Sequence, residues 1–374
     1  MILTIIVFLA VLSLLVLVHE FGHFFVARLA GIGVLEFALG LPFTKPIWSK
    51  KLKGGMKISL YPILFGGFVK LLGEESDENL KNSFSRQGVW SRIAVVVAGV
   101  TMNFILAIVL FYGFLALSNF KVLVPRLADY HFLSPNENRV VVTAVQDGSP
   151  AKITGLVPGD VILSADGKQF TKFVDFQTYT KSRAGFDMTL LVSDETISNR
   201  RTVKVTPRKN PPVGQGALGL GIADGIVVSF QTPQEKSLSG LTYAVDMLGY
   251  NLQVIGHLGA ASFKSRDVAP LSENVSGPVG IAGAVGTILG LGGSKAIVAM
   301  LNFVGLLSLS LGFMNILPFP ALDGGRLAFL LVEAFTGRKL AAKKENLINQ
   351  IGMLALLGLI ILISFNDLKR VFGK

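Results

Sequence analysis

The sequence predicts a polytopic α-helical membrane protein that crosses the bilayer four times and carries an inserted α+β domain. Four long apolar stretches lie near residues 2–24, 93–118, 296–317 and 347–365, each close to the length of a membrane-spanning helix. The 374 residues are 51% hydrophobic and only 16% charged, against about 25% charged in soluble proteins. Between the second and third stretches, charged residues, Pro and Gly increase and short strand patterns appear.

The first apolar stretch ends in a metal-ligand motif. Residues 1–18 contain no charged side chain, and Val18-His19-Glu20-Phe21-Gly22-His23 then reads H-E-x-x-H. Helical residues i and i+4 share a face, so His19 and His23 can point at one cation. Glu20 lies beside them as the candidate general base. The alternative is a polar helix end that faces water, but ionisable groups inside a span are costly and usually functional.

Composition restricts the chemistry further. The chain has no Cys, so a Zn²⁺ site must use His, Asp or Glu. The net charge of +11 fits basic loops against an anionic lipid bilayer. Nucleic acid is not expected as a partner, because no recognition motif accompanies the charge. No basic residue precedes the first apolar stretch, so we interpret it as a retained span rather than a cleaved signal peptide.

The segment between the first two spans is strongly basic. Residues 25–92 hold ten Lys or Arg, which predicts a cytoplasmic location and an N-terminus outside. Short strand patterns at 57–61 and 68–72, with Pro62 and Gly66-Gly67 between them, predict a β-hairpin. This hairpin either dips into the membrane beside other protein segments or is an ordinary cytoplasmic hairpin.

Residues 119–235 are predicted to form an α+β domain outside the cytoplasm. Strand patterns occur at 140–145, 161–163, 188–192 and 202–205. The segment from Gly148-Ser149-Pro150-Ala151 to Pro158-Gly159-Asp160, with Asp166-Gly167 as a turn, resembles the bacterial PDZ pattern over about 138–208. A PDZ-like domain implies a groove that binds peptide ends by adding a strand to a sheet edge. The alternative is a β-rich spacer.

Residues 236–295 are predicted to hold two further elements. Apolar residues recur at helical spacing in 236–262, at Leu238, Leu241, Val245, Leu248, Leu252 and Ile255. This pattern predicts an amphipathic helix that lies on the membrane surface or against the spans; packing is the favoured role and gating of substrate entry the alternative. Residues 276–294 contain seven Gly, which predicts a loop or a broken helix packed closely on its neighbours. His131 and His257 are expected to be structural.

The last region, 296–374, contains the third and fourth spans. The third span ends in Asn315-Ile316-Leu317-Pro318-Phe319-Pro320-Ala321-Leu322-Asp323-Gly324, where two Pro are expected to unwind the helix and present Asp323 at its end. The basic loop that follows is predicted to be cytoplasmic, although three basic residues in the C-terminal tail conflict with its outside placement. The predicted regions are therefore 1–118, 119–235, 236–295 and 296–374.

These motifs together resemble the site-2 protease family, and within it the RseP type (regulator-of-sigma-E proteases). The likeness rests on H-E-x-x-H in the first span, a PDZ-like insert and N-x-x-P-x-P-x-L-D-G in a late span, and it runs nearly end to end. One departure is that a single PDZ-like pattern is present, whereas some members carry two. The resemblance implies an intramembrane zinc metalloprotease of the bacterial inner membrane, with its active site near the cytoplasmic side.

The resemblance also implies roles for individual residues. Asp323 is the implied third zinc ligand beside His19 and His23, and Asn315 is implied to hold substrate or stabilise an oxyanion. Gly66, Gly67, Phe68 and Val69 correspond to a membrane-associated β-element that pairs with unwound substrate. The implied substrates are single-pass membrane proteins, such as trimmed anti-sigma factors, and remnant signal peptides.

Two alternatives stay open at this point. An HtpX-like membrane zinc protease would take a Glu as third ligand from a helix downstream of H-E-x-x-H, whereas the downstream candidate here is Asp323. A membrane-anchored PDZ scaffold would not be an enzyme, and it would have no need of Glu20.

Overall fold

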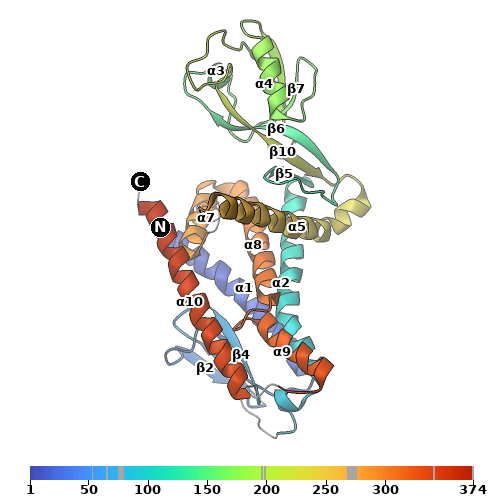
Figure 1. Cartoon of the computed structure of the whole chain (residues 1–374), viewed down its shortest axis with the longest axis vertical. Coiled ribbons are helices and arrows are strands. Elements are labelled where there is room, and N and C mark those ends of the chain that lie inside the picture. The colour runs from blue at the N-terminus through green and yellow to red at the C-terminus, as the bar shows by residue number, and fades with distance from the viewer. Residues whose placement is uncertain are drawn as a thin grey trace. The chain divides into compact units, whose positions relative to one another are not determined.

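The structure is a computed structural model of the chain (Figure 1). It describes residues 1–52, 54–64, 66–74, 80–194, 197, 199–267, 276–339 and 342–372. The chain divides into two compact units: Met1–Leu110 with Leu258–Lys374, and Phe111–His257. The first unit is therefore built from both ends of the chain, and the second is an insertion.

Long helices form most of the first unit. They are α1 (Ile2–Leu29), α7 (Pro278–Gly290), α8 (Gly293–Ile316), α9 (Asp323–Thr336), α10 (Ala342–Phe372) and the larger part of α2 (Val89–Leu117). In the described part of the chain, α1, α2, α8 and α10 are long and apolar enough to cross a membrane. They coincide with the four apolar stretches of the sequence, so the predicted helices at those places are confirmed.

The helix that carries the H-E-x-x-H motif, α1, packs against three other helices. α1 contacts α7 and α8, and Val11 and Leu15 of α1 are buried in one cluster with Val304 of α8. Gly22 lies directly against α2, where a Cβ atom would approach the Ala98 carbonyl oxygen to 2.4 Å. Because small residues let helix backbones approach closely, Gly22 sets the α1–α2 distance beside the motif.

A four-stranded sheet follows α1 and corrects the predicted hairpin. Its strands are β1 (Val34–Leu39), β2 (Trp48–Lys51), β3 (Lys57–Leu60) and β4 (Gly67–Leu71), in the order β2-β3-β1-β4. β3 runs parallel to β1 and β4 antiparallel to it, so the two strands expected to pair with each other both pair with β1 instead. The prediction of a β-hairpin from 57–61 and 68–72 was therefore wrong. β1 was not predicted, because its apolar residues follow α1 without clear alternation.

The Gly-rich segment 276–294 contains a helix of 13 residues. α7 begins at Pro278 and ends at Gly290, and Gly292 and Gly293, the N-cap and first residue of α8, adopt positive φ. The Asp367 carboxylate of α10 accepts the backbone N–H groups of Gly277 and Gly280 at the start of α7, both at 2.9 Å. The predicted broken helix is thus a pair of helices joined at two Gly, and α10 anchors the first of them.

The second unit contains a six-stranded sheet with short helices. Its strands are β5 (Lys121–Pro125), β6 (Asn136–Val145), β7 (Val161–Ala165), β8 (Met188–Ser193), β9 (Arg200–Val205) and β10 (Leu220–Ser229), and its helices are α3 (Pro150–Ile153) and α4 (Phe173–Ser182). The strand order is β5-β10-β6-β7-β8-β9. The four predicted strands are β6 to β9, and the Asp166-Gly167 turn is present with positive φ at both residues. The sheet also contains β5 and β10, which lie before and after the PDZ-like pattern of residues 138–208 in the sequence.

α5 (Pro233–Ser265) is the predicted amphipathic helix, but its buried face differs from the predicted stripe. Tyr243, Ala244, Asp246, Met247 and Tyr250 are buried, and Asp246 accepts the backbone N–H groups of Leu133 and Ser134. The predicted apolar residues are instead exposed, among them Leu238, Leu241, Val245, Leu252 and Ile255. The packing of α5 is therefore carried by aromatic and polar side chains, which the apolar stripe did not indicate.

Candidate metal centre

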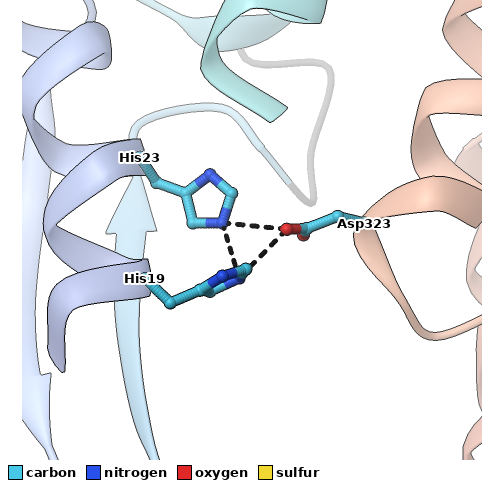
Figure 2. Close-up of side chains that lie close together, drawn as sticks. All are labelled: His19, His23 and Asp323. Atoms are coloured by element: carbon cyan, nitrogen blue, oxygen red, sulfur yellow. Dashed lines mark hydrogen bonds and ion pairs between the residues drawn. The ribbon is translucent and has the colours of Figure 1, made fainter. Parts of the chain in front are cut away.

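Three side chains from two distant parts of the sequence meet in the first unit. His19 and His23 of α1 point toward Asp323, the first residue of α9 (Figure 2). The Asp323 Oδ2 atom lies 3.0 Å from His19 Nε2 and 3.2 Å from His23 Nε2. The two Nε2 atoms are 3.2 Å apart. The three atoms thus form a nearly equilateral triangle.

This triangle fits a tetrahedral zinc ion. For zinc bonds of about 2.0–2.1 Å, the ligand atoms of a tetrahedral site lie about 3.3 Å apart, close to the observed edges. Asp323 Oδ2 is buried and makes no well-aligned hydrogen bond to any residue that the structure describes, as expected of an atom aimed at a cation rather than at an N–H group. In the described part of the chain, His19, His23 and Asp323 form the one group with suitable ligand spacing. The donor set of two imidazoles and a carboxylate also suits zinc.

The loop after α8 brings Asp323 into place. α8 ends at Ile316, Leu317 is extended, and α9 starts at Asp323. Ala321 adopts φ +74°, a strained conformation for a residue with a side chain. An added Cβ on Gly325 would lie 2.4 Å from the Phe319 carbonyl oxygen. The predicted unwinding at the two Pro is present, and the Gly residue lets α9 fold back tightly on the loop.

The ion pairs that hold α9 were not found by sequence reasoning. Arg92 of α2 forms a bidentate pair with Glu333 of α9, with Nη1 3.0 Å from Oε2, and both side chains are mostly buried. Arg326, in the first turn of α9, pairs with Glu74 and stacks over Phe84. Two charged contacts therefore fix the helix that begins with Asp323, and no local pattern links residues so far apart in sequence.

α2 supplies a second contact surface that the sequence did not indicate. The His23 Nδ1 atom lies 2.8 Å from the Val95 carbonyl oxygen, and Asn103 Nδ2 lies 3.1 Å from His19 Nδ1. Gly99 lies between them, where an added Cβ would be 2.4 Å from His23 Nε2. Val95, Gly99 and Asn103 are spaced by four residues and so share one face of α2. This spacing within an uncharged span is the sequence pattern that could have indicated the contact surface.

The remaining predicted residues occupy two other places. Glu20 is half-buried in α1, and an added Cβ on Gly67 would lie 3.6 Å from Glu20 Cγ. Gly67, Phe68 and Val69 belong to β4, and Gly66 precedes it with its carbonyl accepting from Gly40 N–H. β4 therefore lies beside the predicted general base. Asn315 is partly exposed in the last turn of α8, eight positions before Asp323.

Comparison with known proteins agrees with this arrangement. A protein of Brucella suis named "Putative zinc metalloprotease" is 32% identical over 98% of this chain and 95% of its own length. Metalloprotease MmpA of Caulobacter vibrioides is 30% identical, over 96% of this chain and 94% of its own. A solved PDZ domain from an SdrC-like protein of Listeria monocytogenes matches 22% of the chain at 23% identity and a TM-score of 0.20. The PDZ-like character of the insert therefore continues to rest on its sequence pattern.

The family model described as "Peptidase family M50" matches residues 7–359. That range includes α1 with both His residues, the inserted unit and the start of α9 with Asp323. The match confirms the resemblance to site-2 proteases that the motifs indicated. The chain belongs to peptidase family M50, the site-2 protease family of zinc metalloproteases.

Proposed function

We propose that this protein is an intramembrane zinc metalloprotease that hydrolyses peptide bonds within or near the transmembrane segments of single-pass membrane proteins. The observation that carries the proposal is the triangle of His19, His23 and Asp323 on helices that adjoin apolar spans. Three protein ligands with one position left open are the pattern of catalytic rather than structural zinc sites. We assign His19, His23 and Asp323 as the metal ligands.

Glu20 is the proposed general base. Zinc bound at the three ligands supplies Lewis-acid chemistry, which polarises a carbonyl and lowers the pKa of water to about 7. Glu20 accepts a proton from the water that adds to the peptide carbonyl carbon, and donates it to the leaving amine nitrogen as the C–N bond breaks. The position of Glu20 next to His19 in α1, with its Cγ 3.6 Å from where a Cβ on Gly67 would lie, supports this role for a peptide bond held at β4.

The open edge of β4 is the proposed binding place for substrate. Among the described strands, β4 pairs only with β1, so its other edge is without a strand partner. A transmembrane helix hides its carbonyls in internal hydrogen bonds and must unwind before cleavage. An unwound segment can regain those hydrogen bonds by pairing with Gly66, Gly67, Phe68 and Val69. Asn315 is proposed to hold the substrate from the end of α8 or to stabilise the developing oxyanion.

The inserted unit offers a second edge for peptide binding. β10 pairs with β6 along Leu220 to Val228, but β5 covers only Gly225 to Ser229 on its other side. The first half of β10 is therefore unpaired on that side among the described strands. Asp224 accepts the backbone N–H of Phe173 at the start of α4, which places α4 beside this edge. We propose that peptide ends add to β10 here, as in a PDZ domain.

We further propose that the protein spans the bacterial inner membrane and acts in regulated intramembrane proteolysis of anti-sigma-factor-like proteins and remnant signal peptides. The four apolar helices and the basic segment 25–92 support this placement. The basic segment would lie in the cytoplasm close to the metal site, and the inserted unit outside the cytoplasm.

Two variants test the proposed chemistry. Glu20→Gln should keep wild-type zinc content, because it changes no ligand, and should abolish cleavage of a model single-pass substrate. Asp323→Ala should lose both bound zinc and cleavage, because two His ligands alone hold zinc weakly. Zinc is measured by elemental analysis of the purified full chain, and cleavage is assayed with and without a chelator. Full cleavage by Glu20→Gln, or unchanged zinc in Asp323→Ala, would refute the assigned roles.

A further inference from the structure

Asn103 is a buried polar side chain that the proposed mechanism does not use. It lies in α2 and is fully buried, at 0% exposure. Its Nδ2 atom is 3.1 Å from His19 Nδ1, while its Oδ1 atom is buried without a hydrogen-bond partner in the described part of the chain. Buried side-chain amide atoms nearly always have a hydrogen-bond partner, and His19 Nδ1 is the one partner found among the described residues for the Asn103 amide, so the end of the amide that faces this proposed ligand matters.

The explanation follows from where the His19 proton must lie. His19 Nε2 faces Asp323 and His23, so a metal ion in the triangle takes the Nε2 lone pair. The proton of the neutral ring is then on Nδ1, which becomes a donor. A donor at 3.1 Å requires an acceptor, and the amide NH₂ group is not one. A half-turn of the Asn103 amide puts Oδ1 at that place without changing the shape of the side chain.

His23 provides the internal comparison. Its Nδ1 atom lies 2.8 Å from the Val95 carbonyl oxygen, a group that can only accept. The backbone therefore holds the His23 proton on Nδ1 and leaves Nε2 free for a metal. Among the described residues, His19 Nδ1 has no carbonyl partner of this kind and faces a side chain that can act as donor or acceptor. The Ser308 hydroxyl of α8 donates to the backbone carbonyl oxygen of Asn103 at 2.8 Å, which holds the α2 backbone against α8 at this residue.

We propose that Asn103 is a positioning residue for zinc, whose Oδ1 accepts the His19 Nδ1 proton and thereby keeps Nε2 available as a ligand. The inference rests on the metal centre proposed above. Outer hydrogen bonds of this kind orient a ligating His and raise its basicity, and their loss typically costs about 10–100-fold in metal affinity. Asn103 contacts no reacting atom in this role and acts only through His19.

Two substitutions separate an acceptor from a packing role. Asn103→Leu keeps the number of side-chain heavy atoms and the branching at Cγ but has no acceptor, so zinc affinity should fall about 10–100-fold. Asn103→Asp keeps an acceptor oxygen, so its zinc affinity should stay within about ten-fold of wild type. Affinity is measured on the metal-free full chain in detergent by competition with a chelator. The Co²⁺ absorption spectrum provides a second readout, because its intensity reports tetrahedral coordination.

Asn302→Leu is the matched control. Asn302 lies in α8, its Oδ1 is also buried without a partner, and no hydrogen bond to either His is found for it among the described residues. Its replacement should leave zinc affinity and the Co²⁺ spectrum at wild-type values. A loss equal to that of Asn103→Leu would show a general effect of removing a buried amide and would overturn the inference.

The other outcomes also decide the question. Wild-type zinc affinity in Asn103→Leu overturns the positioning role, provided that His19→Ala loses zinc. If His19→Ala also keeps its zinc, the metal centre itself is wrong, so the two failures are distinguishable. If Asn103→Leu does not fold, Asn103→Asp decides alone: a loss above about ten-fold contradicts the proposal, and retention within about ten-fold supports it.

Discussion

α2 and α10 are both long apolar helices that suit a membrane, yet their surroundings differ sharply. In the most apolar 18-residue stretch of each helix, 39% of the α2 residues but only 6% of the α10 residues are buried within the protein. α2 presents Val95, Gly99 and Asn103 to the two His residues. α10 touches the rest of its unit at a few points. Two helices of similar apolarity therefore differ in role: α2 lines the candidate metal centre, and α10 contributes local anchors and an otherwise exposed surface.

The few contacts of α10 are specific. Near its start, Asn349 accepts the N–H of Ala321 at 3.2 Å, and Gly352 lies against Pro320. Both partners belong to the loop that leads to Asp323. Near its end, Asp367 holds the start of α7. Substitutions along the two helices should therefore give graded effects that depend on what each residue touches and not on helix hydrophobicity.

The largest effect is expected at Gly99 of α2. In Gly99→Ala the new Cβ would lie 2.4 Å from His23 Nε2 and 2.8 Å from His19 Cε1, so both rings must move. We expect zinc affinity to fall by about 100-fold or more, with loss of cleavage, because a displacement of about 1 Å can cost that much. Chelator competition and a substrate-cleavage assay measure the two effects. Normal zinc binding in this variant would show that α2 does not limit the centre.

A smaller effect is expected at Gly352 of α10. A Cβ at this position would meet the Pro320 carbonyl oxygen at 2.6 Å and its Cβ at 2.5 Å. Because this loop leads to Asp323, Gly352→Ala should lower cleavage by about ten-fold and zinc affinity by less than Gly99→Ala does. The critical result is which of the two variants loses more zinc affinity. A greater loss in Gly352→Ala than in Gly99→Ala would contradict the expectation that α2 affects the metal centre more than α10 does.

Stability rather than activity should change at Asp367. Asp367→Ala leaves the N–H groups of Gly277 and Gly280 without their acceptor, which should cost about 1–3 kcal/mol. Asp367→Asn keeps one acceptor oxygen and should cost less. Thermal unfolding in detergent measures the difference, and zinc content per folded molecule should stay at the wild-type value. A changed zinc content would mean that α7 is coupled to the metal site.

No effect is expected at Gly358, which serves as the control for both Gly variants. It lies in α10, and nothing approaches within 4 Å of an added Cβ. Gly358→Ala is therefore neutral or slightly stabilising, because Ala favours the helix. Zinc affinity, cleavage and thermal stability should all match the wild type. Impaired cleavage here would indicate that α10 contacts the substrate or another protein through its exposed face.

The sequence by itself determined the elements whose signals are local. The four apolar helices, the strands β6 to β9, the Asp166-Gly167 turn and the i, i+4 pair of His19 and His23 all follow from spacing within a few residues. The motif around Asp323 was also recognisable, and the prediction that it meets the two His agrees with the observed distances. Periodicity and motif spacing therefore sufficed to identify the three proposed ligands.

Only the tertiary structure decided which residues surround those ligands. The pairing of β3 and β4 with β1, the ion pairs that hold α9, and the contacts of Val95, Gly99 and Asn103 join segments that are distant in sequence. In an apolar span every face looks alike to a hydropathy pattern, because lipid and protein interior are both apolar. The exposed stripe of α5 shows the same ambiguity, since apolar spacing identifies a helix but not the surface that covers it.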